Sequence, residues 1–325
     1  MKYIWERKNW FDFKYDEAVL LKPLSQLRVL EGKLLGRVVS LDIKLETEAQ
    51  ADILVEETLR TFRLKSKALV TEWTFEKGLL FPLVSGTDVN RYCDLPERQY
   101  ILFPYKIDGT LVELINFDLI SKDYPKTAAY LLENRKRLED RERGKFKGDD
   151  WYRFGRNQNI GIQDQIKLCV PRLVNNLYAA YDAEGDHFLD NVDVGGITLK
   201  PEYQKQGLVY LLGLPNSKLL RWYFPFVSAP FRGGWLSANR QFLSQLPFRI
   251  INFSDPTDKA RHEKIVELVE RMLSLHRELA AARTPDEKTR IQRQIEATDH
   301  QIDHLVYELY GLTEKEIQIV EEGMK

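Results

Sequence analysis

The 325-residue sequence predicts an α+β protein built from three parts. Apolar residues recur at helical spacing near both ends, which predicts a helical hairpin at the N-terminus and an antiparallel, coiled-coil-like helical hairpin at the C-terminus. Short alternating or wholly apolar runs between turn signals fill the middle, which is typical of a mixed α/β domain. The expected boundaries are residues 1–60, 61–253 and 254–325.

Composition points to a globular chain. Hydrophobic residues make up 43% and charged residues 30% of the sequence. No apolar run approaches the roughly 20 residues that a membrane span needs, so no membrane association is expected. The two cysteines, Cys93 and Cys169, lack any metal-binding spacing, which favours free thiols in a reducing cytoplasm.

Residues 1–60 contain two candidate helices. Asp16 can cap the first, and Thr47 with Gln50 forms a capping-box pattern for the second. Apolar positions follow each cap at helical spacing. They are Leu20, Leu24, Leu27, Leu34, Leu35 and Val38 in the first helix, and Ala51, Leu54, Thr58 and Phe62 in the second.

Part of this segment resembles a known module. Tyr3-Ile4-Trp5, Trp10-Phe11-Asp12-Phe13 and Gly32–Arg37 are similar to the short helical segment that precedes Fic domains, the nucleotidyl-transfer fold. The resemblance covers about residues 1–57. The Fic signature HxFxxGNGR is absent, so the resemblance implies a helical fold and no activity.

The middle of the chain alternates strands and turns. Phe62 to Phe75 predicts short strands, and Tyr100 to Tyr105 predicts a buried strand followed by an Asp108-Gly109 turn. A helix is expected from Asp123-Tyr124-Pro125 to about Gly144, and a strand over Ile166–Val170.

Basic residues gather in the region 126–178, which has 12 Lys/Arg against 7 Asp/Glu. The basic face of the helix expected up to about Gly144 is often merely solvated in proteins. Contact with DNA phosphates is the alternative for Arg135, Lys136 and Arg137. The following loop, Gly148 to Ile160, combines aromatic residues with Arg and Asn. Arginine can pair with guanine edges and asparagine with adenine edges, which makes this loop a candidate for base reading. The candidates are Arg153, Arg156, Asn157 and Asn159, whereas Trp151 and Tyr152 could equally anchor the loop in the core.

The stretch Leu208–Phe253 carries five Lys/Arg and no Asp or Glu. Two apolar runs meet at Pro215-Asn216-Ser217, a turn and helix-start signal, and a Gly-Gly loop follows. Apolar runs joined by acid-free loops suit a rigid scaffold that offers loops to a polyanion. The candidates are Arg232, Trp235 and Asn239 for base edges, and Lys218 and Arg240 for phosphates.

The tail has the clearest helical signals. Asp255-Pro256 and Thr284-Pro285-Asp286-Glu287 each start a helix, Gly311 stops the second, and Thr313 with Glu316 caps a third. His300 and His304 lie one turn apart, but no third ligand accompanies them. The acidic stretch 182–193 lacks the register of a calcium loop. Surface polar roles are therefore expected for the histidines, solvated turns and strand ends for the acidic stretch, and no metal site.

Several motifs resemble the TaqI-like specificity domain, which follows the catalytic part of adenine-specific DNA methyltransferases and fused restriction-methylation enzymes. They are Leu208–Phe248, with its Asn216-Ser217 and Arg232-Gly233-Gly234-Trp235, the tail Ile302–Ile317, Tyr100–Pro104 and Trp151–Pro171. The resemblance covers about residues 65–325 and implies recognition of a short duplex DNA sequence.

Catalytic motifs are missing from these 325 residues. There is no Pro-Pro pair and therefore no NPPY-type motif, and no glycine-rich loop for S-adenosylmethionine. We therefore expect no catalytic residues and no cofactor. S-adenosylmethionine and Mg²⁺ would be needed only with a separate catalytic partner. The expected partners are double-stranded DNA and a methyltransferase or nuclease subunit, or a second copy through the helical tail. The alternative is a regulatory or partner-assembly protein that binds no DNA.

Overall fold

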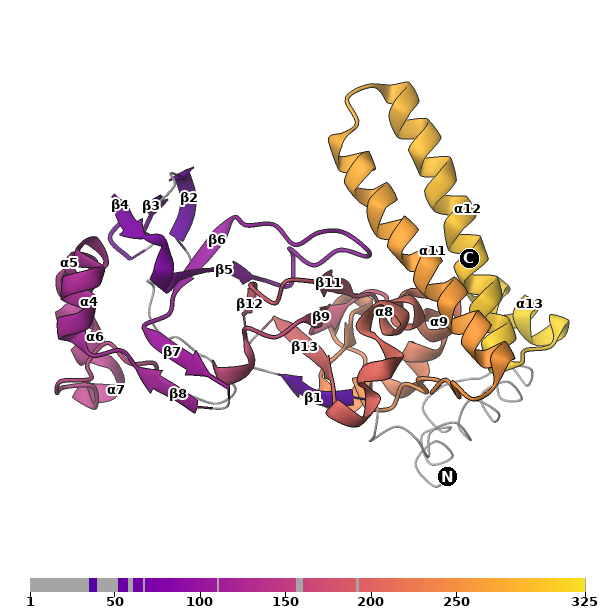
Figure 1. Ribbon diagram of the computed structural model, residues 1–325, viewed down its shortest axis with the longest axis horizontal. Coiled ribbons are helices and arrows are strands. Elements are labelled where there is room, and N and C mark those ends of the chain that lie inside the picture. The colour runs from indigo at the N-terminus through magenta and orange to yellow at the C-terminus, as the bar shows by residue number, and fades with distance from the viewer. Residues whose placement is uncertain are drawn as a thin grey trace.

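In the computed structural model, the described residues are 35–39, 52–57, 61–66, 68–109, 111–155, 160–190 and 193–324. Figure 1 shows two lobes along the longest axis. Most of the described residues between 52 and 144 build the first lobe, and most of the described chain after residue 160 builds the second, which the loop around Arg91 and Tyr92 also contacts. A long helical hairpin projects from the second lobe.

A six-stranded sheet forms the base of the first lobe. Its order is β12-β5-β6-β2-β3-β4, and every neighbouring pair is antiparallel except β12 and β5. The strands are β2 (Asp52–Glu57), β3 (Thr61–Lys65), β4 (Glu72–Glu76), β5 (Leu80–Val84), β6 (Gln99–Leu102) and β12 (Phe188–Leu189). The expected strands over Phe62–Phe75 and at Tyr100 are thus confirmed.

A hairpin and four short helices complete this lobe. The hairpin strands β7 (Tyr105–Asp108) and β8 (Leu111–Leu114) flank the expected Asp108-Gly109 turn. The helix expected from Asp123 to Gly144 begins at Pro125 but is broken at Asn134 and Asp140, and its last segment contains Glu142 and Arg143 with positive φ. The helices are α4 (Phe117–Asp123), α5 (Pro125–Glu133), α6 (Arg135–Glu139) and α7 (Arg141–Gly144), with 3-10 turns at Lys77–Leu79 and Ile160–Ile162.

The second lobe contains a four-stranded antiparallel sheet of order β1-β13-β9-β11. Its strands are β1 (Leu35–Val39), β9 (Lys167–Pro171), β11 (Ala180–Asp182) and β13 (Val194–Leu199). The strand expected at Ile166–Val170 is therefore confirmed. A small second pair joins β10 (Leu173–Val174) to β14 (Leu236–Ser237).

Helices pack around this sheet and enclose the largest apolar cluster of the described residues. The helices α8 (Leu208–Asn216) and α9 (Lys218–Val227) are buried along most of their length, because their apolar residues cover more than one face. Short turns flank them: 3-10 turns at Pro201–Gln206 and Arg232–Gly234, and α10 (Arg240–Leu243).

The predicted C-terminal hairpin is confirmed. The helices α11 (Pro256–Ala281) and α12 (Pro285–Tyr310) run antiparallel, and α13 (Glu314–Gly323) folds back onto α9. The expected caps are present at Asp255, Thr284 and Thr313, and Gly311 ends α12 in the left-handed conformation. Among the described helices, none is both long and apolar enough to cross a bilayer.

The N-terminal helical hairpin is wrong where the structure describes it. Leu35–Val39 and Asp52–Glu57 are strands, although both overlap expected helices. Their apolar spacing suits a helix, but β13 offers β1 an edge, and β2 inserts between β3 and β6. Pairing with distant strands outweighs a weak local preference. The remaining predictions, for residues 1–34, 40–51 and 58–60, lie outside the described residues.

Candidate nucleic-acid interface

The buried helices α8 and α9 form the first part of the acid-free stretch and are the scaffold for the loops that follow them. The Asn216 side chain is fully buried and joins α8 to β11, because its amide accepts a hydrogen bond from the Ala179 N–H (2.9 Å) and donates one to the Ala179 carbonyl (3.0 Å). The next residue, Ser217, caps α9. The predicted turn and helix start at Pro215-Asn216-Ser217 therefore fix where α9 begins.

The 229–237 loop follows α9 and is closed by backbone hydrogen bonds. The Phe231 N–H donates to the Trp235 carbonyl (2.6 Å), and the Ser237 N–H donates to the Ala229 carbonyl (3.0 Å). Gly233 and Gly234 at the tip have φ of 73° and 81°, which glycine adopts without steric cost. Strand β14 at the end of the loop pairs with β10, so the loop is anchored at its base.

Two of the five cations in this stretch, Lys218 and Arg249, pair with carboxylates inside the protein, and a third, Arg221, is partly buried with its Nε lacking a hydrogen-bond partner among the described residues. The Lys218 ammonium donates to Glu321 (2.7 Å) and lies 3.9 Å from Asp303 Oδ2. Arg249 pairs with Asp258 (3.1 Å). Burial, together with the nearby Arg91 charge, lowers the pKa of Arg221. Lys218, a predicted phosphate contact, is thus held by carboxylates of α12 and α13.

The remaining two cations, Arg232 and Arg240, are exposed. Neither forms an ion pair with another residue in the part of the chain that the structure describes. They lie at the tip of the 229–237 loop and just beyond its end. This is the one place in the acid-free stretch where positive charge faces solvent without a counter-charge among the described residues.

The predicted base readers on this loop have different surroundings. Trp235 is 44% exposed, as a recognition residue would be. Asn239 is engaged locally, because its Oδ1 caps α10 by accepting from the Gln241 N–H (3.0 Å) and its Nδ2 donates to Ser237 Oγ (3.1 Å). Phe231, which the sequence reasoning missed, is 57% exposed. Its position beside the Arg-Gly-Gly turn was the signal that could have identified it.

The second predicted set lies in the first lobe. Trp151 and Tyr152 are buried and anchor the loop, which confirms the alternative stated for them, and Tyr152 donates to the Ile115 carbonyl (2.6 Å). Arg153 pairs with Asp150 and lies over the Phe146 ring. The candidates Arg156, Asn157 and Asn159 lie outside the described residues.

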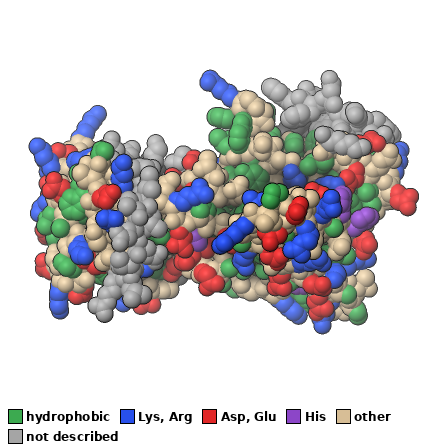
Figure 2. Space-filling view, turned by 90° about the horizontal axis from the view of Figure 1, so that it is seen from above, with side chains coloured by type: hydrophobic (Ala, Val, Ile, Leu, Met, Phe, Trp, Pro, Cys, Tyr) green, Lys and Arg blue, Asp and Glu red, His purple; other side chains and the backbone are tan. Residues whose placement is uncertain are grey.

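On α6, two of the three predicted phosphate contacts have partners. Arg135 donates to Glu139 (2.7 Å), and Arg137 donates to the Ala68 carbonyl (2.7 Å), whereas Lys136 is exposed and has no ion pair with a described residue. Helix α6 lies at the far end of the first lobe from α9, so the structure does not bring the two sets together. On the face shown in Figure 2, acidic and basic side chains are intermixed over both lobes, so any anion-binding surface there is local.

A polar cluster lies in the acidic stretch that raised the metal alternative. The carboxylate oxygens of Asp182 and Asp186 and a His187 ring nitrogen lie within 4.8 Å of one another. The buried Lys167 ammonium pairs with Asp182. Burial opposes charge on His187, but the hydrogen bond to Asp182 (3.2 Å) and the Asp186 charge raise its pKa. The Lys167 ammonium thus supplies positive charge to this cluster, and the neighbouring carboxylates favour protonation of His187.

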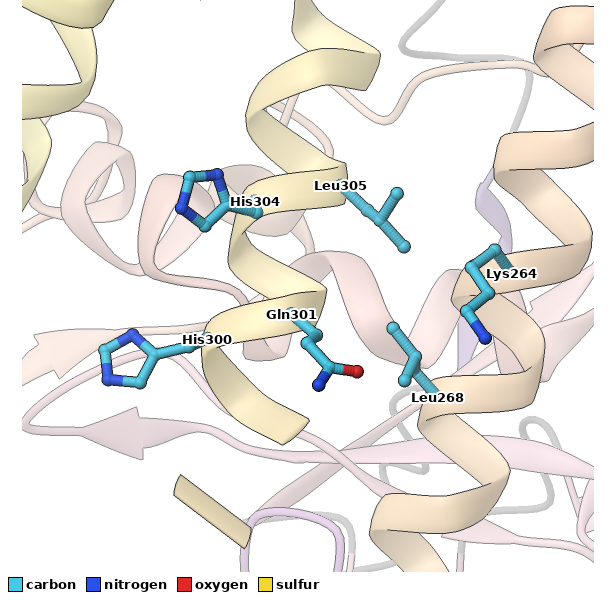
Figure 3. A pocket seen from close by; sticks show the side chains of 6 residues that line it. All are labelled: Lys264, Leu268, His300, Gln301, His304 and Leu305. Carbon is cyan, nitrogen blue, oxygen red and sulfur yellow. The ribbon is translucent and has the colours of Figure 1, made fainter. Parts of the chain in front are cut away.

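The two histidines of α12 border a hollow of about 390 Å³ between α11 and α12. In Figure 3, Gln301 and Leu305 lean toward Leu268 and Lys264 on α11, whereas the His300 and His304 rings lie on the other side of α12. Both histidines are exposed, in agreement with the predicted surface polar role.

Comparisons with known proteins give distant matches. A family model described as a domain of unknown function (DUF4172) matches residues 3–72. The type II restriction enzyme and methyltransferase RM.Eco57I of Escherichia coli is 26% identical over 268 residues, which are 78% of this chain and 27% of that protein. The type II methyltransferase M.BstVI of Geobacillus stearothermophilus is 21% identical over 260 residues, covering 77% of this chain and 37% of that protein.

Among solved structures, the type IIG restriction endonuclease BpuSI matches with a TM-score of 0.46 and 12% identity, over 92% of this chain and 34% of that one. The chain thus spans about a quarter to a third of the length of the curated relatives it matches. It is distantly similar to type II restriction-modification enzymes and methyltransferases.

Proposed function

We propose that this chain is a DNA target-recognition module of a restriction-modification system. It would read a short duplex sequence and hold the DNA for a catalytic domain, which would supply the chemistry with S-adenosylmethionine and Mg²⁺. The observation that supports this most is the exposure of Arg232 and Arg240 in a stretch without acids. The distant similarity to restriction-modification enzymes favours DNA as the polyanion.

The structure sharpens which residues should carry the binding. Arg240 remains a phosphate candidate, and we add Arg232, which the sequence predicted as a base reader, because both are exposed and neither has an ion pair among the described residues. Lys136 is a weaker candidate in the other lobe. Lys218, Arg135 and Arg137 already have partners, and we expect them to support the fold more than DNA binding.

Salt dependence tests the proposal. Binding of the full chain to fluorescein-labelled duplex of random sequence should weaken steeply as salt rises, because phosphate contacts release counterions. Arg232→Gln and Arg240→Gln should each lower the slope of log Kd against log salt by about one. Arg277→Gln is the matched control, since Arg277 is also exposed but donates to Asp94 (2.9 Å). Undetectable or salt-independent binding would overturn the proposal.

Two further measurements define the role. Selection from a random duplex pool should return a preferred sequence, and loss of a base-reading side chain should relax that preference at one base pair. The chain alone should transfer no methyl group from S-adenosylmethionine, and transfer would contradict the non-catalytic part of the proposal.

The second candidate function is protein assembly. Phe231 and Trp235 are exposed together with Leu173 at the base of the loop, and exposed apolar groups also mark protein interfaces. In that case, the wild-type chain would not bind duplex DNA, and Trp235→Ala would abolish its binding to a protein partner.

A further inference from the structure

The 229–237 loop holds two exposed aromatic rings in a fixed arrangement. Phe231 and Trp235 are four residues apart, and the hydrogen bond from the Phe231 N–H to the Trp235 carbonyl (2.6 Å) joins their backbones directly. The indole lies against Gly233, where an added Cβ would be 3.6 Å from Trp235 Cδ1. Neither ring stacks on another aromatic ring of the described residues, so both are available to a ligand.

Hydrogen-bonding groups are scarce around these rings. Phe231 has no polar side-chain atom, and Trp235 has one donor. The nearest amide, Asn239, already uses its Oδ1 and Nδ2 within the chain. The loop is therefore better suited to stacking and charge pairing than to reading base edges by hydrogen bonds.

The flanking charges fit a nucleic acid. Arg232 lies between the two aromatics in sequence, Arg240 follows three residues after the loop, and no acid occurs from Leu208 to Phe253. Aromatic or apolar side chains next to arginines can insert between base steps while the guanidinium groups hold the neighbouring phosphates. A protein partner would need acidic residues opposite these two arginines. Nothing on this loop indicates such a partner.

We propose that Phe231 and Trp235 stack on bases that have left the duplex stack, while Arg232 and Arg240 hold the flanking phosphates. This inference rests on the proposed function and adds the mode of contact. Its consequence is a preference for DNA in which a base is already free. Stacking on one base contributes roughly a five- to hundredfold gain in affinity.

The test compares two fluorescein-labelled duplexes that differ by one nucleotide: one is fully paired, and the other carries a single extra, bulged 2-aminopurine in one strand. The full chain should bind the bulged duplex at least about fivefold more tightly, and 2-aminopurine fluorescence should fall as the base stacks on a ring. Trp235→Phe should retain both effects. Trp235→Leu and Phe231→Leu should reduce the preference while binding to the paired duplex persists.

Controls separate stacking from general binding. Arg232→Gln should weaken binding to both duplexes by the same factor. Leu132→Ala, at a similarly exposed apolar position on α5, should change the affinity for neither duplex. Because the substituted loop positions Phe231, Arg232 and Trp235 are all exposed, these variants should keep the wild-type circular-dichroism melting curve. Salt-dependent binding without preference or quenching would overturn the stacking inference and leave the proposed function intact. Absence of all DNA binding would overturn the proposed function itself.

Discussion

Asp303 is buried at the junction between the helical hairpin and the second lobe. Its Oδ1 accepts a hydrogen bond from the Lys218 N–H (2.8 Å) at the start of α9, but its Oδ2 has no hydrogen-bond partner among the described residues. Burial, with the neighbouring Asp299 charge, raises the pKa of Asp303 to about 6, although Lys218 and Arg91 act in the opposite direction. The negative charge at this site is thus unfavourable in the folded state.

Asp303→Asn should therefore stabilise the protein at neutral pH. The folded pKa is about 6 and the ordinary aspartate value is about 3.9, so the folded state binds more protons between these limits and wild-type stability falls as pH rises through them. Two pKa units correspond to at most about 3 kcal/mol. The asparagine oxygen can still accept from the Lys218 N–H. We expect a gain of about 1–3 kcal/mol at pH 8 and almost none at pH 4.

Urea unfolding at a series of pH values measures this difference. Other groups titrate in the same range, so the quantity of interest is the gap between variant and wild type at each pH. Asp258→Asn is the matched control, because Asp258 is also buried but pairs with Arg249 (3.1 Å) and should lose stability throughout. A loss of stability for Asp303→Asn at pH 8, or a gap independent of pH, would refute the reasoning.

Three further substitutions test packing and backbone geometry. Leu268→Asp should cost about 3–5 kcal/mol in urea unfolding, because Leu268 is 2% exposed in the hairpin seam; a midpoint matching that of the exposed neighbour variant Glu267→Ala would show an open seam. Val70→Gly should raise the free energy of unfolding by about 0.5–1 kcal/mol, because this exposed residue has a φ of 58°, which glycine adopts more readily than valine. A lower free energy of unfolding would show that residue 70 is not in the left-handed region. Gly185→Ala should lower the melting temperature strongly, since its Cβ would lie 2.7 Å from the Gln165 carbonyl carbon at a φ of 74°, and an unchanged melting curve would contradict that contact.

Signals confined to a few neighbouring residues were predicted well. Asp255-Pro256 and the Thr284–Glu287 capping box specify helix starts through contacts two or three residues apart, so the sequence alone reveals them. Strand β2 could not be predicted in this way, because its pairing depends on β3 and β6, whose edges exist only in the folded sheet.

The candidate interface shows the same division. The acid-free stretch and its Gly-Gly turn are visible in the sequence and identified the loop. Which cations are free is not visible, since Lys218 meets Glu321 across 103 positions and Arg249 meets Asp258 in the first turn of α11. Phe231 was missed because an apolar residue is by default assigned to the core.

The position of β2 has a consequence for any shortened form of the protein. Residues 52–57 lie inside a six-stranded sheet, between β6 and β3. A chain that started at residue 61 would lack this strand and would present two unsatisfied strand edges within one lobe. Such edges recruit strands from other molecules. Self-association of such a fragment would therefore report a missing strand, and not a natural oligomer.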